Sequence, residues 1–510
     1  MRLNILIGGK AGQGINKVSE IISNTLTRYG YFVFNYRDYP SLIRGGHNFN
    51  ILSASEEKIE SHDNKIDFLI TLDEETEKIH LKELKKECQI LSYKEFENEG
   101  RNLNIALAGA LIKTLGIPIE ELENEIKREF PDKPEPLSSA QKGYNSKKAV
   151  SNLKKIEKKI WIMDGSKAIA KGAINSNLDV YIAYPMTPAT NTMHEIAKNQ
   201  LKNKLMVLQA ENEIAVANMA LGASFTGAKT MVGTSGGGFD LMTEAISFQG
   251  ISGIPLTIYL ASRPGPGTGV PTYSAQEDLD IALRGGHGEF PRVVVAPSNP
   301  LEAIEKTNEA LYLAEEFKTI SIILSDKHLA ESEFSTNEKI KKPSKIKISR
   351  ALPGEKIIRA SSYEINKELT TTESPEIVKQ NADARTQKYE KIKKFIEKKF
   401  EMIKIYGNKK SDNLIIGWGS TSGAIKDAIK GLDCKFLQVL YIKPLSKQIK
   451  KEMSKAKNII LVEQNVTGQL GRLLREKTGI SVPRKKRILK YDGKPFTRDE
   501  LNEEIRKKLK

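Results

Sequence analysis

The chain has 510 residues, of which 39% are hydrophobic and 28% charged, so it is long enough for about three domains, and none of its runs approaches the roughly 20 apolar residues of a membrane helix. Its formal net charge is +16, but the lysines interleave with glutamates, which favours a lysine-rich surface over a nucleic-acid-binding face. The first residues lack the length and cleavage site of a signal peptide, so we expect a cytoplasmic protein that binds neither a membrane nor nucleic acid.

Strand and helix patterns alternate along most of the chain, which predicts an α/β fold with three doubly wound domains. The expected limits are residues 1–150, 160–334 and 411–510 for the domains and 335–410 for a polar linker. A connector over about 131–160 is expected to begin with prolines and to continue as a lysine-rich helix. The linker is expected to contain a helix near Gln387–Ile403.

A glycine-rich loop, Gly8–Gly14, lies where the first expected strand hands over to a helix. Backbone N–H groups of Gly9, Gly12 and Gly14 could hold an anion there. The loop is neither a P-loop nor a dinucleotide-binding fingerprint, because its spacing is G-x-x-G-x-G and no Gly-Lys-Ser/Thr ends it. A tight glycine turn that serves packing alone explains it equally well.

Loops that follow strands of the second domain contain most of the candidate site residues. Tyr184–Pro188 has two prolines that stiffen it, so that Thr187 becomes a rigidly placed hydroxyl suited to a substrate carboxylate. Gly236 and Gly237 would let a ligand or a subunit approach the backbone closely. On its own, Tyr184–Pro188 is better explained as an ordinary proline turn. The strands are expected at Val180–Ala183, Lys229–Gly233, Leu256–Leu260, Arg292–Ala296 and Ile320–Leu324.

Two further residues have side chains suited to chemistry. Glu213 begins a helix rich in alanine and glycine, and if buried it could share a proton with a heterocyclic nitrogen. A solvated helix charge is the more common fate of a glutamate. Arg263 opens a proline- and glycine-rich loop that ends at Thr272, and these two could bind a carboxylate. The alternative is a structural loop whose arginine pairs with a nearby acid.

Taken together and in this order, the segments resemble the α subunit of 2-oxoacid:ferredoxin oxidoreductases, in the form with the γ domain fused at the N-terminus. Tyr184–Pro188 is similar to the family's Y-P-I-T-P motif, and Arg263–Thr272 is similar to its R-x-G-P-S-T-G-x-P-T loop with Gly267 in place of serine. The glycine-rich loop differs by one residue in spacing. Gly417–Thr421 and Val462–Gln469 resemble its C-terminal domain.

This resemblance implies a γ-type domain, a pyrimidine-binding domain for thiamine diphosphate and a transketolase C-terminal-like domain. Glu213 would be catalytic and would hydrogen-bond the pyrimidine N1′ nitrogen. Arg263, Thr272 and Thr187 would bind the substrate. The remaining implied contacts are Tyr184, Pro185, Gly236 and Gly237 with the cofactor, and Gly9, Gly12 and Gly14 with coenzyme A. The reaction would be coenzyme-A-dependent oxidative decarboxylation of a 2-oxoacid to acyl-CoA and carbon dioxide, with electrons passed to ferredoxin.

The chain lacks part of what this reaction needs. Its two cysteines, Cys88 and Cys434, are too few for a [4Fe–4S] cluster, and no metal-ligand spacing occurs. No G-D-G…N motif for the diphosphate and Mg²⁺ is present. The resemblance assigns both to a β subunit, with the active site at an αβ interface and an (αβ)₂ assembly. Pyruvate, 2-oxoglutarate and branched-chain acids remain open, with a slight lean towards 2-oxoglutarate or a broad range. The alternatives are the pyrimidine-domain subunit of a lipoate-linked 2-oxoacid dehydrogenase and a non-catalytic basic binding protein or scaffold.

Overall fold

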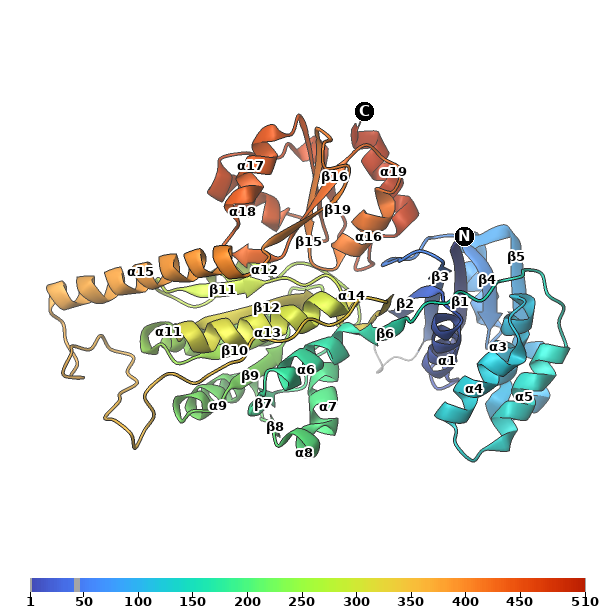
Figure 1. Ribbon diagram of the computed structural model, residues 1–510, viewed down its shortest axis with the longest axis horizontal. Coiled ribbons are helices and arrows are strands. Elements are labelled where there is room, and N and C mark those ends of the chain that lie inside the picture. Colours follow the sequence, from blue (N-terminus) through green and yellow to red (C-terminus); the bar gives the residue numbers. More distant parts are fainter. Residues whose placement is uncertain (1, 41–45, 510) are drawn as a thin grey trace. The chain divides into compact units, whose positions relative to one another are not determined.

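The computed structural model describes residues 2–40 and 46–509, and within them the chain divides into two compact units (Figure 1). Unit 1 consists of Met1–Met163, Glu331–Lys339 and Phe496–Asn502. Unit 2 consists of Asp164–Ala330, Ile340–Pro495 and Glu503–Lys510. Unit 1 therefore takes short segments from two later parts of the chain, in addition to the N-terminal residues.

In the described residues, unit 1 is built on a mixed seven-stranded sheet with the order β5-β4-β1-β3-β2-β13-β6. Strand β1 runs parallel to β4 and antiparallel to β3, so the sheet is mixed. The strands are β1 (Arg2–Lys10), β2 (Phe32–Asp38), β3 (His47–Ser55), β4 (Ile66–Thr71), β5 (Leu84–Ser92), β6 (Trp161–Asp164) and β13 (Glu333–Thr336). The helices are α1 (Ile15–Arg28), α2 (Glu75–His80), α3 (Leu103–Thr114), α4 (Ile119–Glu129) and α5 (Pro134–Asn145).

The expectation of a lysine-rich helix at the end of the connector is wrong. Helix α5 occupies its proline-bearing first half, and residues 147–160 form no helix. Backbone groups of this stretch bond to the ends of other helices instead: Leu153 N–H donates to Leu115 O, and Ile156 N–H to Tyr29 O. The segment's hydrogen-bonding groups are therefore satisfied by its neighbours, which removes the need for a helix of its own.

Unit 2 contains the second sheet, with the order β17-β11-β12-β10-β9-β7-β8 in the described residues. Its neighbours run parallel except at β17, which is antiparallel to β11. Its strands are β7 (Val180–Ala183), β8 (Met206–Gln209), β9 (Thr230–Thr234), β10 (Leu256–Ser262), β11 (Arg292–Val295), β12 (Ile320–Asp326) and β17 (Tyr441–Lys443). The accompanying helices are α6 (Gly165–Asn175), α7 (Thr190–Lys198), α8 (Gln200–Asn203), α9 (Glu213–Phe225), α10 (Gly236–Leu241), α11 (Thr243–Ser252), α12 (Leu279–Arg284), α13 (Pro300–Phe317) and α14 (Lys327–Glu331).

The third sheet also lies in unit 2 and has the order β14-β16-β15-β18-β19 in the described part of the chain. Strand β17 follows β16 directly yet joins the second sheet, and one hydrophobic cluster includes residues of both sheets, such as Leu260 and Leu437. The two sheets therefore share a core. The elements are β14 (Ile403–Gly407), β15 (Asn413–Trp418), β16 (Lys435–Val439), β18 (Asn458–Glu463), β19 (Arg487–Leu489), α16 (Thr421–Ala428), α17 (Lys447–Lys455), α18 (Gln469–Thr478) and α19 (Arg498–Leu509).

The linker contains a longer helix than expected. Helix α15 spans Pro375–Lys399, so it begins twelve residues before the expected start and ends four before the expected end. The Ser374 side chain accepts a hydrogen bond from Ile377 N–H and caps it. In this helix only Ile392 and Ile396 are buried, so its N-terminal half has no apolar stripe by which sequence periodicity could reveal it.

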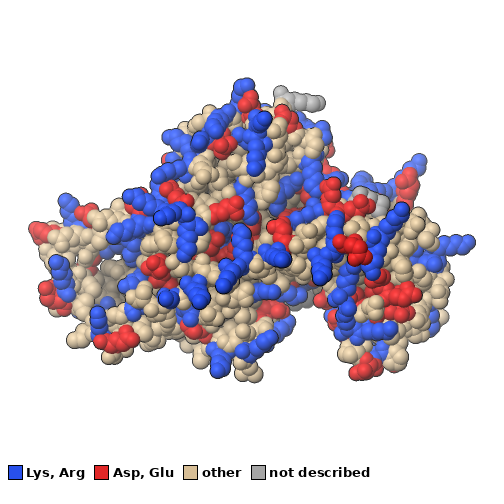
Figure 2. Space-filling model, viewed as in Figure 1, with Lys and Arg blue, Asp and Glu red and all other residues tan. Residues whose placement is uncertain are grey.

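Within the described ranges, we find no helix with the length and apolar character needed to cross a membrane. Figure 2 shows Lys and Arg side chains intermingled with Asp and Glu over the visible face. That mixture agrees with the lysine-rich, mixed surface that the sequence predicts.

Candidate active site

The candidate site lies at one edge of the second sheet, where strands β10, β9 and β7 lie side by side and run parallel. Parallel strands bring their carboxyl ends to the same edge. The loops that follow these strands are therefore neighbours there: Tyr184–Pro188 after β7, the triple glycine after Ser235, and Arg263–Thr272 after β10.

Glu213 lies in this region and is only 3% exposed. It is the first residue of α9, whose N-terminus is capped by the Asn212 side chain, which accepts a hydrogen bond from Ala215 N–H at 2.9 Å. Glu213 Oε1 is buried and has no hydrogen-bond partner among the described residues. The common alternative, a solvated charge, is thus wrong for Glu213 and right for the exposed Glu211 two residues earlier. Glu211 precedes the helix, which begins at Glu213.

Of the three consecutive glycines, Gly238 lets the backbone pass close to this carboxyl group. A Cβ atom on Gly238 would lie 2.5 Å from Glu213 Oε1 and 2.2 Å from Thr234 Oγ1. A Cβ on Gly236 would lie 2.5 Å from Asp278 Oδ1, whereas one on Gly237 would meet only Gly267 O, at 3.9 Å. Glycine is therefore required at positions 238 and 236, because a Cβ there would collide with an acidic side chain. At position 237 there is open space in front of the backbone.

Arg263 connects two of the expected motifs. Its Nη1 donates a hydrogen bond of 2.8 Å to Thr187 O. Partial burial lowers the pKa of Arg263, and the negative charges of Asp278 and Glu213 act in the opposite direction. The structure therefore brings Arg263, Thr187 and Glu213 together, and their roles in substrate binding and catalysis stay predictions.

Sequence reasoning did not identify Asp278. Ser262 Oγ donates to Asp278 Oδ2 at 2.6 Å, and burial raises the pKa of Asp278 to about 6, although the Ser262 hydrogen bond and Arg263 lower it. The sequence did contain a signal for Ser262, because this residue ends strand β10 directly before Arg263. Asp278 lies in a polar stretch without a recognisable spacing, so nothing in the sequence pointed to it.

The other predicted residues differ in their surroundings. Thr272 is buried at the end of the loop that Arg263 opens, and its hydroxyl makes no hydrogen bond to Glu213, Arg263 or Thr187 in the described part of the chain. Tyr184 is 40% exposed, and Pro185 is half-buried. Tyr184 and Pro185 therefore remain available for contact with a ligand or with another chain, and Thr272 does not.

In unit 1, the glycine-rich loop is partly occupied by its own side chain. Gln13 Oε1 accepts a hydrogen bond from Lys10 N–H at 2.7 Å, and Gln13 Nε2 donates to Leu72 O at 3.0 Å. Gly12 and Gly14 have positive φ angles of 93° and 79°. A Cβ on Gly12 would meet nothing within 4 Å. Anion binding by Gly9, Gly12 and Gly14 stays a prediction.

Residues in the segments that resemble the family's C-terminal domain form hydrogen bonds with the residues that follow Thr272. Gln464 N–H donates to Gln276 Oε1 at 3.0 Å, and Gln464 Nε2 donates to Ser274 O at 2.9 Å. Gln276 Nε2 in turn donates to Trp418 O at 2.8 Å. These residues therefore hold the third sheet against the segment that follows Thr272.

The two cysteines do not form a metal site. Burial raises the pKa of the Cys88 and Cys434 thiols to about 11, so both are protonated at neutral pH and are poor metal ligands. Among the residues that the structure covers, no group of three or more His, Cys, Asp or Glu side chains could hold a metal ion.

Comparison with known families gives two matches. The family model described as "Pyruvate flavodoxin/ferredoxin oxidoreductase, thiamine diP-bdg" matches residues 171–401. The model described as "Pyruvate ferredoxin/flavodoxin oxidoreductase" matches residues 4–102. The first covers the candidate site, and the second covers the glycine-rich loop of unit 1.

Individual relatives agree. The chain is 29% identical to the 2-oxoacid:ferredoxin oxidoreductase subunit alpha of a Sulfolobus species, over 100% of this chain and 97% of that one. It is 30% identical to the 2-oxoglutarate synthase subunit KorA of Archaeoglobus fulgidus, over 61% of this chain and 89% of that one. A solved structure of 2-oxoglutarate:ferredoxin oxidoreductase from Magnetococcus marinus, with 2-oxoglutarate, coenzyme A and succinyl-CoA bound, matches with a TM-score of 0.91, 25% identity and 100% coverage of both chains.

These matches confirm the resemblance and the α/β fold class that the sequence predicts. The Sulfolobus subunit spans the full length of this chain, so the N-terminal α/β part belongs to the same polypeptide in both. The chain belongs to the 2-oxoacid:ferredoxin oxidoreductase family, as an α subunit.

Proposed function

We propose that this chain supplies the pyrimidine side of a thiamine-diphosphate site and catalyses, with a β subunit, coenzyme-A-dependent oxidative decarboxylation of a 2-oxoacid. The observation that carries this proposal is the buried Glu213 carboxyl group, whose Oε1 has no partner among the described residues. An unpaired buried carboxyl oxygen is costly. A ligand that offers a hydrogen bond at this position would remove the cost.

The residues around Glu213 fit thiamine diphosphate. The pyrimidine ring presents a nitrogen that can share a proton with a carboxyl group, and the open position beside Gly237 leaves room for a flat ring. We assign Glu213 to the pyrimidine nitrogen, and Tyr184, Pro185, Gly236 and Gly237 to contacts with the cofactor. When bound, thiamine diphosphate supplies the nucleophilic carbon that makes decarboxylation of a 2-oxoacid possible. Glu213 would hold the proton at the ring nitrogen.

Arg263 supports the choice of a 2-oxoacid. Its guanidinium is half-buried beside Glu213 and is anchored at one end by Thr187 O, so its other N–H groups can bind a carboxylate. We assign the Thr187 and Thr272 hydroxyls to the substrate as well. We favour 2-oxoglutarate or a broad range of 2-oxoacids, because the Archaeoglobus fulgidus and Magnetococcus marinus proteins are named for 2-oxoglutarate and the Sulfolobus protein for 2-oxoacids in general.

The name "subunit alpha" implies a partner subunit in the assembly. We propose that it is a β subunit that carries the diphosphate and Mg²⁺ site and a [4Fe–4S] cluster, within an (αβ)₂ assembly that reduces ferredoxin in the cytoplasm. Support comes from apolar side chains around the site that are exposed in this chain. They are Tyr184, Ile214, Met219, Leu241 and Val270. A subunit that covered them would also close the cofactor site.

The alternatives are less favoured. A subunit of a lipoate-linked dehydrogenase explains Glu213 but not the N-terminal match over residues 4–102. A nucleic-acid-binding protein would need a basic face, whereas cationic and acidic side chains are mixed over the face seen in Figure 2. Coenzyme A binding by Gly9, Gly12 and Gly14 belongs to the proposal, and Gly12, with its positive φ and open surroundings, is the position best suited to backbone contact.

The test is to co-express the chain with its cluster-bearing partner, purify the complex without oxygen and follow coenzyme-A-dependent reduction of a viologen dye by a panel of 2-oxoacids. Glu213→Gln should lower kcat by about a hundredfold or more, because the group that exchanges the proton is lost. The matched control is Glu211→Gln, on an exposed side chain two residues away, and it should keep wild-type activity. A Glu213→Gln complex that is fully loaded with cofactor and fully active would contradict the proposal.

A further inference from the structure

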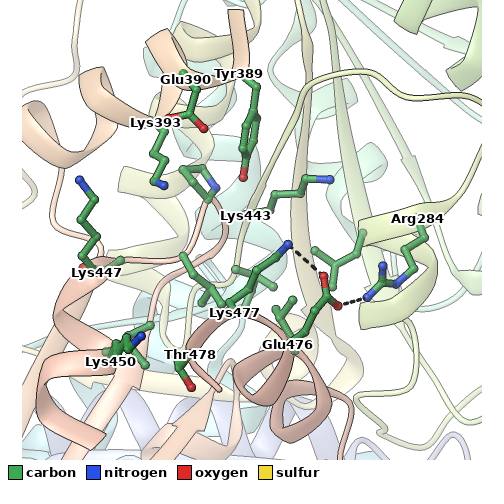
Figure 3. Close-up of a pocket in the computed structure, with 17 residues that line it drawn as sticks. Arg284, Tyr389, Glu390, Lys393, Lys443, Lys447, Lys450, Glu476, Lys477 and Thr478 are labelled. Atoms are coloured by element: carbon green, nitrogen blue, oxygen red, sulfur yellow. Dashed lines mark hydrogen bonds and ion pairs between the residues drawn. The ribbon is translucent and has the colours of Figure 1, made fainter. Parts of the chain in front are cut away.

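A pocket of about 380 Å³ lies in unit 2. Residues of α12, β17, α17 and α18 form it together with helix α15, which lies in the segment that the sequence predicts as a linker. Figure 3 shows Tyr389, Glu390 and Lys393 on α15 facing Glu476, Lys477 and Thr478 on α18. The volume is in the range of clefts that bind small molecules. None of the residues assigned above to the active site lines it.

The pocket is strongly cationic. Of the described residues that line it, six are basic and two are acidic. Glu476 is shared by Lys477 at 2.9 Å and Arg284 at 2.6 Å, and these contacts are drawn as dashed lines in Figure 3. In the described part of the chain, no carboxylate lies within ion-pair distance of Lys393, Lys443 or Lys450. The basic residues are Arg284, Lys393, Lys443, Lys447, Lys450 and Lys477, and the acidic ones are Glu390 and Glu476.

Lys443 experiences this excess of charge most directly. Burial, and after it the positive charges of Arg292, Lys477 and Arg284, lower its pKa to about 8, against the charge of Glu476. Arg292 is itself only 3% exposed, and its guanidinium donates to the carbonyl oxygens of Ala282 and Gly285 rather than to a carboxylate. Several cations thus face one small cavity without enough acid to balance them, and a bound anion would relieve their repulsion.

The remaining lining is apolar. Ile442, Leu445, Ile449 and Leu473 contribute aliphatic surface, and Tyr389 offers a ring whose centroid is 5.9 Å from Lys443 Nζ. A ligand that fits both parts has an anionic group and a flat or apolar group. Lysines are point charges that suit the oxygens of a phosphate, and a tyrosine ring can stack on a heterocycle.

We propose that this pocket binds a nucleoside phosphate, with the phosphate group held by Lys443 and Lys477, which lie side by side in Figure 3, and the base against Tyr389 and the aliphatic side chains. This inference does not rest on the proposed reaction. It makes the junction between α15 and the C-terminal sheet a small-molecule binding site separate from the Glu213 site.

The test uses the complex of the chain with its partner subunit and isothermal titration with ADP, adenosine and inorganic phosphate. Coenzyme A is kept at a saturating concentration, so that any site that binds the ADP part of coenzyme A is already filled and does not contribute to the titration. ADP should bind, inorganic phosphate should compete with it, and adenosine should bind much more weakly. Lys443→Gln and Lys477→Gln should each weaken ADP binding about tenfold or more, which is the loss of one charged hydrogen bond.

The matched control is Lys410→Gln, on an exposed lysine outside the pocket, and it should leave ADP affinity unchanged. A second readout is proton uptake. A bound phosphate raises the pKa of Lys443, so titrations near pH 8 in buffers of different ionisation enthalpy should show protons taken up by the wild type and not by Lys443→Gln. Absence of ADP binding would overturn the proposal, as would equal affinity of the two pocket variants and the wild type, provided that the variants keep their thermal stability.

Discussion

Gly238 controls the space beside the Glu213 carboxyl group. An alanine there would place a Cβ 2.5 Å from Glu213 Oε1 and 2.2 Å from Thr234 Oγ1, so the glutamate would have to move. Because misplacement of a reacting group by about 1 Å can cost a hundredfold in rate, we expect Gly238→Ala to lower the kcat of the complex by about that factor. Steady-state kinetics with a saturating 2-oxoacid measure this.

Gly222 is the matched control for this substitution. It lies in helix α9, and a Cβ there would meet nothing within 4 Å. Gly222→Ala should stabilise the helix by about 0.5–1 kcal/mol without moving the Glu213 carboxyl group, and any effect on the complex would come from the exposed face of α9. If Gly238→Ala kept the wild-type kcat, the carboxyl group would not need its present position.

At the residue scale, the sequence predicted most side chains that the structure brings together. Glu213, Arg263 and Thr187 belong to motifs with recognisable composition, so they could be selected before any fold was known. Asp278 could not be selected, because its burial and its hydrogen bond with Ser262 arise only from tertiary packing. Glu213 could be selected as a candidate, but its burial could not be read from the sequence.

At the element scale, the junction between the second and third sheets depends on buried amide side chains. Gln464 Nε2 donates to Ser274 O and Lys494 O, both at 2.9 Å. Gln464→Ala would leave two carbonyl groups unpaired, which should lower the free energy of unfolding by about 1–3 kcal/mol. Urea denaturation followed by circular dichroism measures this. The control is Gln448→Ala, on an exposed residue of α17, and an equal effect of the two substitutions would argue against the junction.

Elements were predictable where apolar periodicity was strong. The strand expected at Val180–Ala183 is observed at those residues, and the one expected at Ile320–Leu324 extends to Asp326. Helix α15 was predicted only in its second half, because most of it is exposed and lacks an apolar stripe. Strand β17 has three residues and pairs across to another sheet, so no local pattern could have indicated it.

At the scale of the whole molecule, pH acts on stability through a histidine pair in unit 1. His47 Nε2 lies 2.9 Å from His80 Nε2, and His80 Nδ1 lies 2.7 Å from Glu83. Burial, and then the charge of His80, lower the pKa of His47 below its ordinary 6.5. The unfolded chain therefore binds a proton near pH 6 that the folded chain does not, so this pair should make stability fall as pH drops through 6.5.

His47→Gln should reduce this loss of stability. The measurement compares urea midpoints at pH 7.5, 6.5 and 5.5, and the variant should lose less between the first and the last than the wild type does. His194→Gln, on an exposed histidine of α7, serves as the control and should follow the wild type. An unchanged pH dependence in His47→Gln would assign the effect to other groups.

The exposed face of α9 is the last feature that bears on the whole assembly. Ile214 is 51% exposed and Met219 45% exposed, on the helix that begins at Glu213. Apolar side chains beside a cofactor site favour cover by a partner subunit. The double variant Ile214→Asp/Met219→Asp should remain folded, because neither side chain is in the core, yet fail to copurify with the β subunit. Leu201→Asp, at a position 90% exposed on α8, should copurify normally. If the double variant formed the complex as well as Leu201→Asp does, the β subunit would have to cover the Glu213 site from another face.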